Sequence, residues 1–180
     1  VAYNALYINY ECNEREKMIN SYQLFSVSVI ETKIIIQAPL LKKVINWCEK
    51  NNKTENYISV RGGFQEHENF DGKKELDDVL NCFLKVHMRE EIAHGWLNVL
   101  NKNGDNTPHR HSGDIIKNSG VFYLTNNNSA ISFIKDSQVY SFYPKLYDFI
   151  FFPHDLIHQV STHTEDKFRI SYAINTKNIK

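Results

Sequence analysis

The sequence predicts an α+β protein, mainly β, in which two helices are followed by a barrel-like core of strands. Two observations carry this prediction. Segments with helical spacing of apolar residues occur in the first half of the chain, and short β-rich segments follow one another from Trp96 onward. Helices first and strands second are typical of an α+β domain. About eight short strands with turn residues between them are typical of a sandwich or barrel.

A single domain is expected over residues 1–180, because this length matches one domain. We find no internal repeat, low-complexity tract or linker rich in Pro or Gly. We expect the N-terminal strand and helices over about 1–92 and the β-barrel core over about 93–176. An apolar share of 42%, with 11 Phe and 10 Tyr, is sufficient for a packed core.

The first half of the chain contains one expected strand and two expected helices. Partial alternation of apolar residues predicts a strand over Tyr22–Ile36. Helical spacing then begins after Pro39, which suits the first turn of a helix, and it involves Leu40, Leu41, Val44, Ile45 and Cys48. A second amphipathic helix is expected over roughly Lys74–Glu90, from Leu76, Val79, Leu80, Phe83, Leu84 and Val86.

The second half reads as a series of strands separated by turns. Turn residues include Lys102–Asp105 and Asn126–Asn128. The expected strands are Trp96–Leu100, Thr107–His111, Gly120–Thr125, Ala130–Ile134, Val139–Tyr143, Tyr147–Phe152, His158–Ser161 and Lys167–Asn175.

Charge and cysteine content favour a cytoplasmic protein that acts without membrane or nucleic acid. The 21 basic and 21 acidic residues balance, so the total gives no basic surface for nucleic acid, which is an unlikely partner. No apolar run is long enough to span a bilayer, and the N-terminus lacks the apolar stretch of a signal peptide. Three widely spaced cysteines, Cys12, Cys48 and Cys82, are expected to be reduced thiols.

Three histidines form a candidate metal site. His109 and His111 stand at i and i+2, so on a β-strand both imidazoles would point to the same face. His158 follows after 46 intervening residues, at the start of another expected strand. Three imidazoles on one side of a metal leave other positions open, which is typical of a catalytic site. Asp114 is an alternative to His111, because two histidines and one carboxylate are the usual ligands of non-heme iron.

Two further residues favour binding of an anion beside this metal. Arg169 lies eleven positions after His158, and Ser171 would share its strand face. A guanidinium and a hydroxyl on one face can bind a carboxylate together. The remaining histidines are expected to have structural roles; they are His67, His87, His94, His154 and His163.

These residues resemble the motif of the 2-oxoglutarate/Fe(II)-dependent oxygenases. That motif is His-x-Asp/Glu, then His about fifty residues later, then a basic residue some ten positions further on. His109, His158 and Arg169 match it, with Ser171 as in an Arg-x-Ser variant, whereas His111 stands where Asp or Glu is expected. The resemblance implies a double-stranded β-helix (jelly roll) and a hydroxylase that uses Fe(II), 2-oxoglutarate and O2, with ascorbate as a compatible reductant.

A closer resemblance is to a branch of that superfamily seen in marine bacteria and phages. It rests on His109–His111, Ser119–Leu124 (SGVFYL), Phe152–His158 (FPHDLIH) and Arg169–Ser171, with Asn175 near the end. Gly62–Gln65 (GGFQ) is similar to an upstream motif of the same branch. The match covers roughly residues 60–176. By analogy with related oxygenases, Asn98 and Tyr123 are expected to contact the co-substrate; packing on a strand face is the alternative.

Cupins, which share the barrel, are the alternative family. Gly104, His109, His111 and Gly120 approximate one cupin motif, and the segment Pro153–His158 approximates the other. A cupin would be a metal-binding module or an enzyme independent of 2-oxoglutarate, and it has no requirement for Arg169 and Ser171. A zinc-bound or metal-free interaction domain would also leave Arg169 unexplained.

The substrate is expected to be a small molecule or a peptidyl side chain. Selectivity is expected from loops at the mouth of the barrel, namely Arg61–Gly72, Gly113–Asn118 and Pro144–Tyr147. Arg61, Arg110 and Lys117 would give these loops positive charge, which favours an anionic or peptidyl substrate. A homodimer is compatible with the sequence.

Overall fold

The computed structural model describes residues 6–7, 19–24, 27–54 and 59–179. Two helices, α1 (Ala38–Lys50) and α2 (Lys73–His87), lie close to their expected positions. The strands are β1 (Leu6–Tyr7), β2 (Asn20–Leu24), β3 (Val27–Ile35), β4 (Val60–Glu66), β5 (Glu90–His109), β6 (Asn118–Tyr123), β7 (Ile131–Lys135), β8 (Gln138–Phe142), β9 (Asp148–Pro153), β10 (Ile157–Val160) and β11 (Arg169–Asn178).

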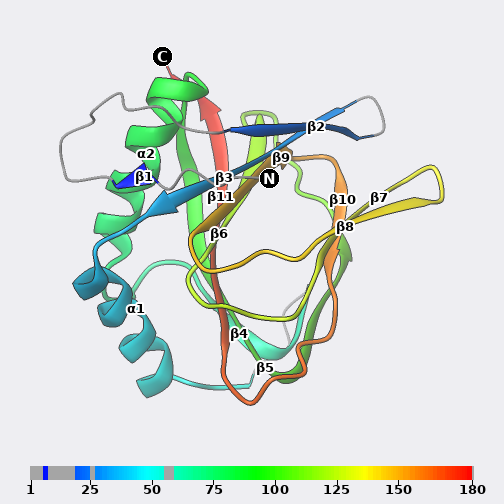
Figure 1. Ribbon diagram of the computed structural model, residues 1–180. Helices are drawn as coiled ribbons and strands as arrows, with labels where there is room; N and C mark the ends of the chain where they lie inside the picture. Colours follow the sequence, from blue (N-terminus) through cyan, green and yellow to red (C-terminus); the bar gives the residue numbers. More distant parts are fainter. Residues whose placement is uncertain (1–5, 8–18, 25–26, 55–58, 180) are drawn as a thin grey trace.

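The strands form one strongly curved sheet that closes into a nearly complete barrel (Figure 1). Its order is β1-β3-β9-β6-β11-β5-β10-β7-β8, with β2 paired to β3 and β4 paired to β5. Among the described residues every pairing is antiparallel except that of β1 with β3. Both helices lie on one flank of the barrel (Figure 1). The predicted mainly-β jelly roll buttressed by helices is therefore confirmed.

Alternation along the strands separates two large apolar clusters, beside a small third one formed by Val60, Leu100 and Val160. Successive side chains of a strand point to opposite faces of its sheet. Phe122 and Phe149 accordingly pack with the helices, around Leu80 of α2. Their chain neighbours Tyr123 and Ile150 instead belong to a second cluster, within the barrel. This second face also carries the polar side chains that line the cavity described below.

One expected turn is a bend inside a continuous strand. We expected two strands, Trp96–Leu100 and Thr107–His111, separated by a turn over Lys102–Asp105, but β5 runs through this region for 20 residues. The strand β4 pairs along it, with an irregularity between Arg61 and Gly63. A β-bulge bends a strand without ending it. Gly and Asn residues are typical of bulges as well as of turns, so their presence at 103–104 did not show which of the two occurs.

Gly104 permits the close approach of β4 and β5 at this bend. A Cβ atom at Gly104 would lie 2.5 Å from the carbonyl oxygen of Gly62, whose own φ of +66° favours glycine. The expectation that Arg61–Gly72 is a loop is therefore wrong for its first half, because β4 reaches Glu66. The expected strand Tyr22–Ile36 is likewise two strands, β2 and β3, paired as a hairpin.

The cysteines differ from the expectation of three reduced thiols. Cys82 on α2 is disulfide-bonded, so the expectation is wrong for this residue. Cys48 is a free thiol and fully buried, and burial raises its pKa to about 12. Cys12 lies outside the described residues. The cytoplasmic location expected from reduced cysteines loses that support.

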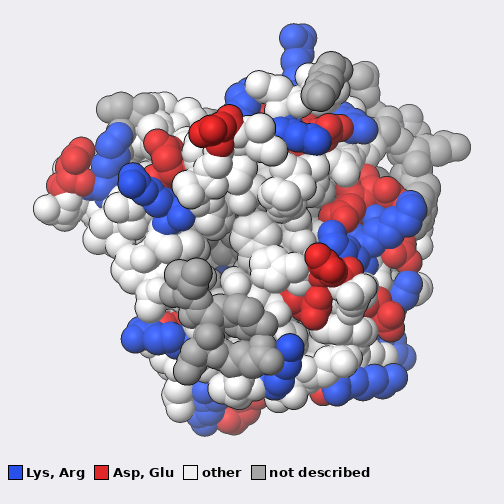
Figure 2. Space-filling view, turned by 180° about the vertical axis from the view of Figure 1, so that it is seen from behind, with Lys and Arg blue, Asp and Glu red and all other residues white. Residues whose placement is uncertain are grey.

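The surface carries charges of both signs. Figure 2 shows Lys and Arg side chains interspersed with Asp and Glu side chains over the face opposite to that of Figure 1. Several charged side chains of the surface are paired, for example Lys102 with Asp166 at 2.8 Å. Neither helix in the described part of the chain is long and apolar enough to cross a membrane.

Candidate metal centre

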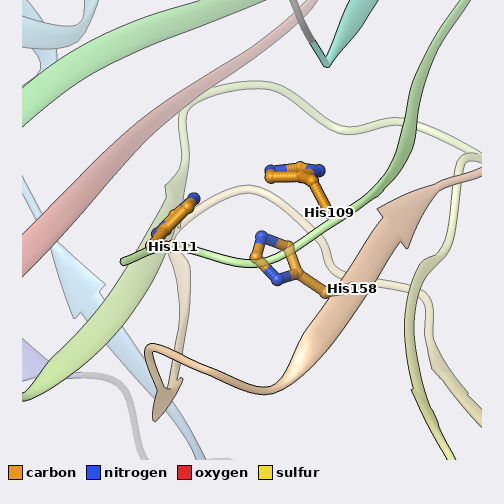
Figure 3. Close-up of side chains that lie close together, drawn as sticks. All are labelled: His109, His111 and His158. Carbon is orange, nitrogen blue, oxygen red and sulfur yellow. The ribbon is translucent and has the colours of Figure 1, made fainter. Parts of the chain in front are cut away.

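Strand pairing brings two of the three candidate ligands together. His109 is the last residue of β5, and His158 lies directly opposite it on β10. Their ring centroids are 4.3 Å apart. One ring nitrogen from each of His109, His111 and His158 lies within 4.8 Å of the others, and Figure 3 shows the three rings turned toward a common point. Two nitrogens bound at about 2 Å to one ion lie at most about 4 Å apart, so a small rotation of the rings would let one ion contact all three.

His111 reaches this cluster by a route that strand alternation does not explain. It lies beyond the end of β5, so the expectation that two histidines share a strand face is wrong for it. Its backbone N–H instead donates to the carbonyl oxygen of His154 at 2.9 Å. Trp96 packs edge-to-face against its ring, with centroids 5.5 Å apart. Contacts from two other segments therefore place His111.

Hydrogen bonds fix which nitrogen of each ring is available to a metal. His109 Nδ1 lies 2.8 Å from the carbonyl oxygen of Thr107, and His158 Nδ1 lies 3.0 Å from that of Leu156. A carbonyl oxygen can only accept, so both Nδ1 atoms carry the hydrogen and both Nε2 atoms keep a lone pair. His111 Nδ1 contacts Asn175 Oδ1 at 2.7 Å. Metal-binding histidines are commonly oriented in this way through their second nitrogen.

The surroundings keep all three imidazoles neutral, which is the form that binds metals. His158 is 4% exposed, and burial, followed by the neighbouring His109, lowers its pKa to about 3. Burial and His109 also lower the pKa of His111 to about 4. Burial lowers the pKa of His109 as well. Asp114, the alternative ligand, is exposed in a turn and does not join the cluster.

The histidines open onto a cavity of about 180 Å³ inside the barrel. Three of the four residues expected to bind the co-substrate line it: Arg169, Ser171 and Asn98. Its apolar wall contains Trp96, Val121, Ile131, Val160 and Ala173. The cavity therefore joins the histidine cluster to the residues expected to bind an anion.

The residues expected to bind the co-substrate form one row across three strands. Ser171 on β11 lies opposite Asn98 on β5 and opposite Tyr123 on β6. Asn98 Oδ1 accepts a hydrogen bond of 2.7 Å from Gln65 Nε2. Tyr123 does not line the cavity; the Arg169 guanidinium lies 5.2 Å from its ring centroid. Tyr123 therefore supports Arg169 from behind.

Arg169 is a buried cation without an anionic partner among the described residues. It is 1% exposed, and burial lowers its pKa. Nη1 donates to Ser171 Oγ at 3.2 Å, whereas Nε and Nη2 have no hydrogen-bond partner. The hydroxyl of Tyr123 makes no hydrogen bond in good geometry either. Burial raises its pKa to about 12, and the neighbouring Arg169 guanidinium opposes this rise. Buried unpaired donors cost free energy, so this end of the cavity fits a carboxylate.

Some residues of the site were not assigned a role from sequence. Ser119 and Asn175 contact His111, and Gln65 contacts Asn98. All three occur in the motifs quoted for the family resemblance, but they come from different strands. Spacing along the chain carries no signal that pairs residues 119 and 175, because only the sheet order makes them neighbours.

Comparison with known proteins identifies the fold. No family model and no curated protein matches the sequence. Among solved structures, a Pseudomonas putida prolyl-4-hydroxylase is similar with a TM-score of 0.62 and 10% identity, over 88% of this chain and 96% of that one. An oxidoreductase of the 2OG-Fe(II) oxygenase family from Burkholderia pseudomallei gives 0.57 and 12%, over 82% and 84%.

A third similar structure contains ligands. HygX from Streptomyces hygroscopicus, with nickel, 2-oxoglutarate and hygromycin B bound, has a TM-score of 0.59 and 10% identity, over 83% of this chain and 82% of that one. At these identities the likeness concerns the fold. The protein therefore has the fold of the 2-oxoglutarate/Fe(II) oxygenase superfamily, with three histidines gathered at one cavity of its barrel.

Proposed function

We propose that this protein is an Fe(II)- and 2-oxoglutarate-dependent dioxygenase that hydroxylates a C–H bond of a peptidyl or small-molecule substrate. One observation carries the proposal. The cavity that receives three available imidazole nitrogens also contains a buried arginine with two unpaired N–H donors. Metal ligands and a carboxylate anchor in one cavity are what binding of 2-oxoglutarate to iron requires.

The histidines would hold the metal and leave positions open for other ligands. Three neutral imidazoles suit iron, although they also suit zinc, copper and nickel. They provide no negative charge, so bound Fe(II) would keep its full double charge. The co-substrate carries two carboxylates and would offset that charge. We therefore expect metal and 2-oxoglutarate to strengthen each other's binding more than in a site with a carboxylate ligand.

Arg169 would bind the carboxylate of 2-oxoglutarate that is distant from the metal. The unpaired Nε and Nη2 of this residue can supply charge-assisted hydrogen bonds. Ser171 fixes one edge of the guanidinium through Nη1, and Tyr123 packs against its face. Asn98, held by Gln65, would contact the same co-substrate from the neighbouring strand.

Bound Fe(II), 2-oxoglutarate and O2 together supply the oxidant for C–H hydroxylation and release succinate and CO2. The protein's own residues then need only to position the reactants and to exclude water. Trp96, Val121, Ile131, Val160 and Ala173 form an apolar wall beside the histidines. No side chain is required to act as a general acid or base.

The three expected cations offer less unpaired positive charge to a substrate than the sequence indicated. Arg61 binds Asp105 through two nitrogens, at 2.8 and 2.9 Å. Lys117 lies 3.2 Å from the buried carboxylate of Glu90. Two of the three expected cations are thus neutralised locally, which leaves Arg110. We accordingly propose a peptidyl or small-molecule substrate, to which Arg110 alone of these three cations would offer positive charge.

Binding of 2-oxoglutarate by an Arg169→Leu variant tests this function against the cupin alternative. Loss of a charge-assisted pair worth about 1.5–3 kcal/mol should weaken binding by roughly one to two orders of magnitude. Arg110→Leu, which removes an exposed arginine beside the histidines, is the control and should bind 2-oxoglutarate normally. Equal binding by wild type and Arg169→Leu would favour a cupin. The absence of succinate formation with Fe(II), ascorbate and a broad substrate panel would contradict an active oxygenase.

A further inference from the structure

Two buried side chains hold the ring of His111 from the side opposite to the cavity. Ser119 on β6 and Asn175 on β11 lie directly opposite each other across the strand pair. They are 1% and 7% exposed. His111 Nδ1 lies 2.8 Å from Ser119 Oγ and 2.7 Å from Asn175 Oδ1, and Ser119 Oγ donates to Asn175 Oδ1 at 2.8 Å. The three polar atoms thus form a closed triangle.

This triangle selects one tautomer of His111. An amide oxygen can only accept, so Asn175 Oδ1 receives the hydrogens of both His111 Nδ1 and the Ser119 hydroxyl. With the hydrogen on Nδ1, the lone pair is on Nε2, the nitrogen available to a metal. The opposite tautomer would place two lone pairs against each other at 2.7 Å.

His111 depends on this triangle more than the other two histidines depend on their partners. His109 and His158 donate to carbonyl oxygens only two residues earlier in their own segments. His111 lies outside any strand and has no local carbonyl partner of this kind among the described contacts. Its ring orientation is set by side chains from two strands that are distant in sequence.

We propose that Asn175, supported by Ser119, is the positioning residue that makes His111 a metal ligand at a place where the sequence resemblance expects a carboxylate. The inference rests on the proposed metal site and deepens it. Partners of this kind typically change metal affinity by 10–100-fold. Asn175→Asp would keep an acceptor at the same place. Asn175→Leu would leave only the Ser119 hydroxyl beside Nδ1, which can either accept from or donate to that nitrogen and so no longer selects one tautomer.

The tautomer of His111 can be measured directly in the metal-free protein by long-range ¹H–¹⁵N NMR of the imidazole nitrogens. Wild type and Asn175→Asp should show His111 with its hydrogen on Nδ1. Asn175→Leu should show a substantial fraction with the hydrogen on Nε2. A merely structural role of Asn175 would leave this signature unchanged, and a wild-type ring with its hydrogen on Nε2 would overturn the proposal.

Titration with Co(II) alone gives the second readout, because it needs neither 2-oxoglutarate nor turnover. Asn175→Leu should bind Co(II) about 10–100-fold more weakly than wild type. Asn175→Asp should bind at least as tightly as wild type. Ser119→Ala should fall between wild type and Asn175→Leu, and it remains a test if Asn175→Leu fails to fold.

Ser132→Ala is the matched control for loss of a buried hydroxyl. Ser132 and Ser141 form a similar cross-strand pair at 2.8 Å on β7 and β8, without a contact to a histidine among the described interactions. The Ser132→Ala variant should bind Co(II) as tightly as wild type does. Equal affinities of Asn175→Leu and wild type, or equal losses in Asn175→Leu and Asn175→Asp, would overturn the proposal.

The outcomes separate this inference from the proposed function. Normal Co(II) binding with the expected tautomer, but without any 2-oxoglutarate turnover, would contradict the oxygenase and leave the role of Asn175 intact. If His111→Ala bound Co(II) as tightly as wild type, His111 would not be a metal ligand. Both this inference and the proposed function would then be overturned.

Discussion

His158 lies directly opposite His109 on the neighbouring antiparallel strand, so the pairing of β10 with β5 itself brings two imidazoles within 4.3 Å, centroid to centroid. Two of the three candidate ligands are therefore placed by the pairing of strands in the barrel, and only His111 lies on irregular chain. Strands position side chains more rigidly than loops do. The β5–β10 pair thus provides a fixed base to which the third histidine is added.

Arg169→Leu should stabilise the protein in the absence of 2-oxoglutarate, or leave its stability unchanged. The substitution removes a buried cation that has two unpaired donors. Saturating 2-oxoglutarate with metal should stabilise wild type by about 2.7 kcal/mol at 100 times its dissociation constant, and the variant far less. Urea unfolding with and without the co-substrate measures both effects. A large loss of stability in the unliganded variant would mean that Arg169 serves the fold and not a ligand.

Gly63→Ala should destabilise the protein, because β4 and β5 approach too closely for a side chain at this position. A Cβ atom at Gly63 would lie 2.0 Å from the carbonyl oxygen of Val99. Overpacking of this kind costs about 1–3 kcal/mol. Urea unfolding checks this. A Gly63→Ala variant as stable as wild type would contradict the described register of β4 on β5.

Arg110→Glu and Lys117→Glu should have different effects although both reverse a charge near the histidines. Lys117 is paired with Glu90, whose side chain is 3% exposed, so Lys117→Glu places two carboxylates together and should lower the free energy of unfolding. Arg110 is exposed, and Arg110→Glu should leave stability unchanged.

Activity measurements distinguish the two variants further. Arg110→Glu should weaken turnover of the true substrate and leave the uncoupled consumption of 2-oxoglutarate nearly intact. If Arg110→Glu lowered both rates equally, residue 110 would serve the metal site and not the choice of substrate.

The sequence was sufficient to predict the helices and most strands of the barrel, but not the course of β5 or the position of His111. Apolar spacing reports which face of an element is buried, and it located α1 and α2 within a few residues. Gly and Asn residues at 103–104 occur equally in turns and in bulges, so only the pairing with β4 distinguishes them. Strand alternation predicted that His111 lies near His109, which the structure shows, but the predicted cause was wrong. His111 lies beyond the end of the strand and not on its face.

Residues far apart in the chain required the structure. The row formed by Asn98, Ser171 and Tyr123 follows from the order β5-β11-β6, which no local pattern encodes. The unpaired donors of Arg169 likewise depend on what surrounds a buried side chain.

Anaerobic titration of His158→Ala with Fe(II) tests the central claim most directly. His154→Ala is the matched control, because its imidazole lies in the same segment but bonds the carbonyl oxygen of Lys117 and is outside the cluster. Wild type and His154→Ala should each bind one Fe(II), and His158→Ala should lose this binding. Full stoichiometric Fe(II) binding by His158→Ala would contradict the metal centre described here.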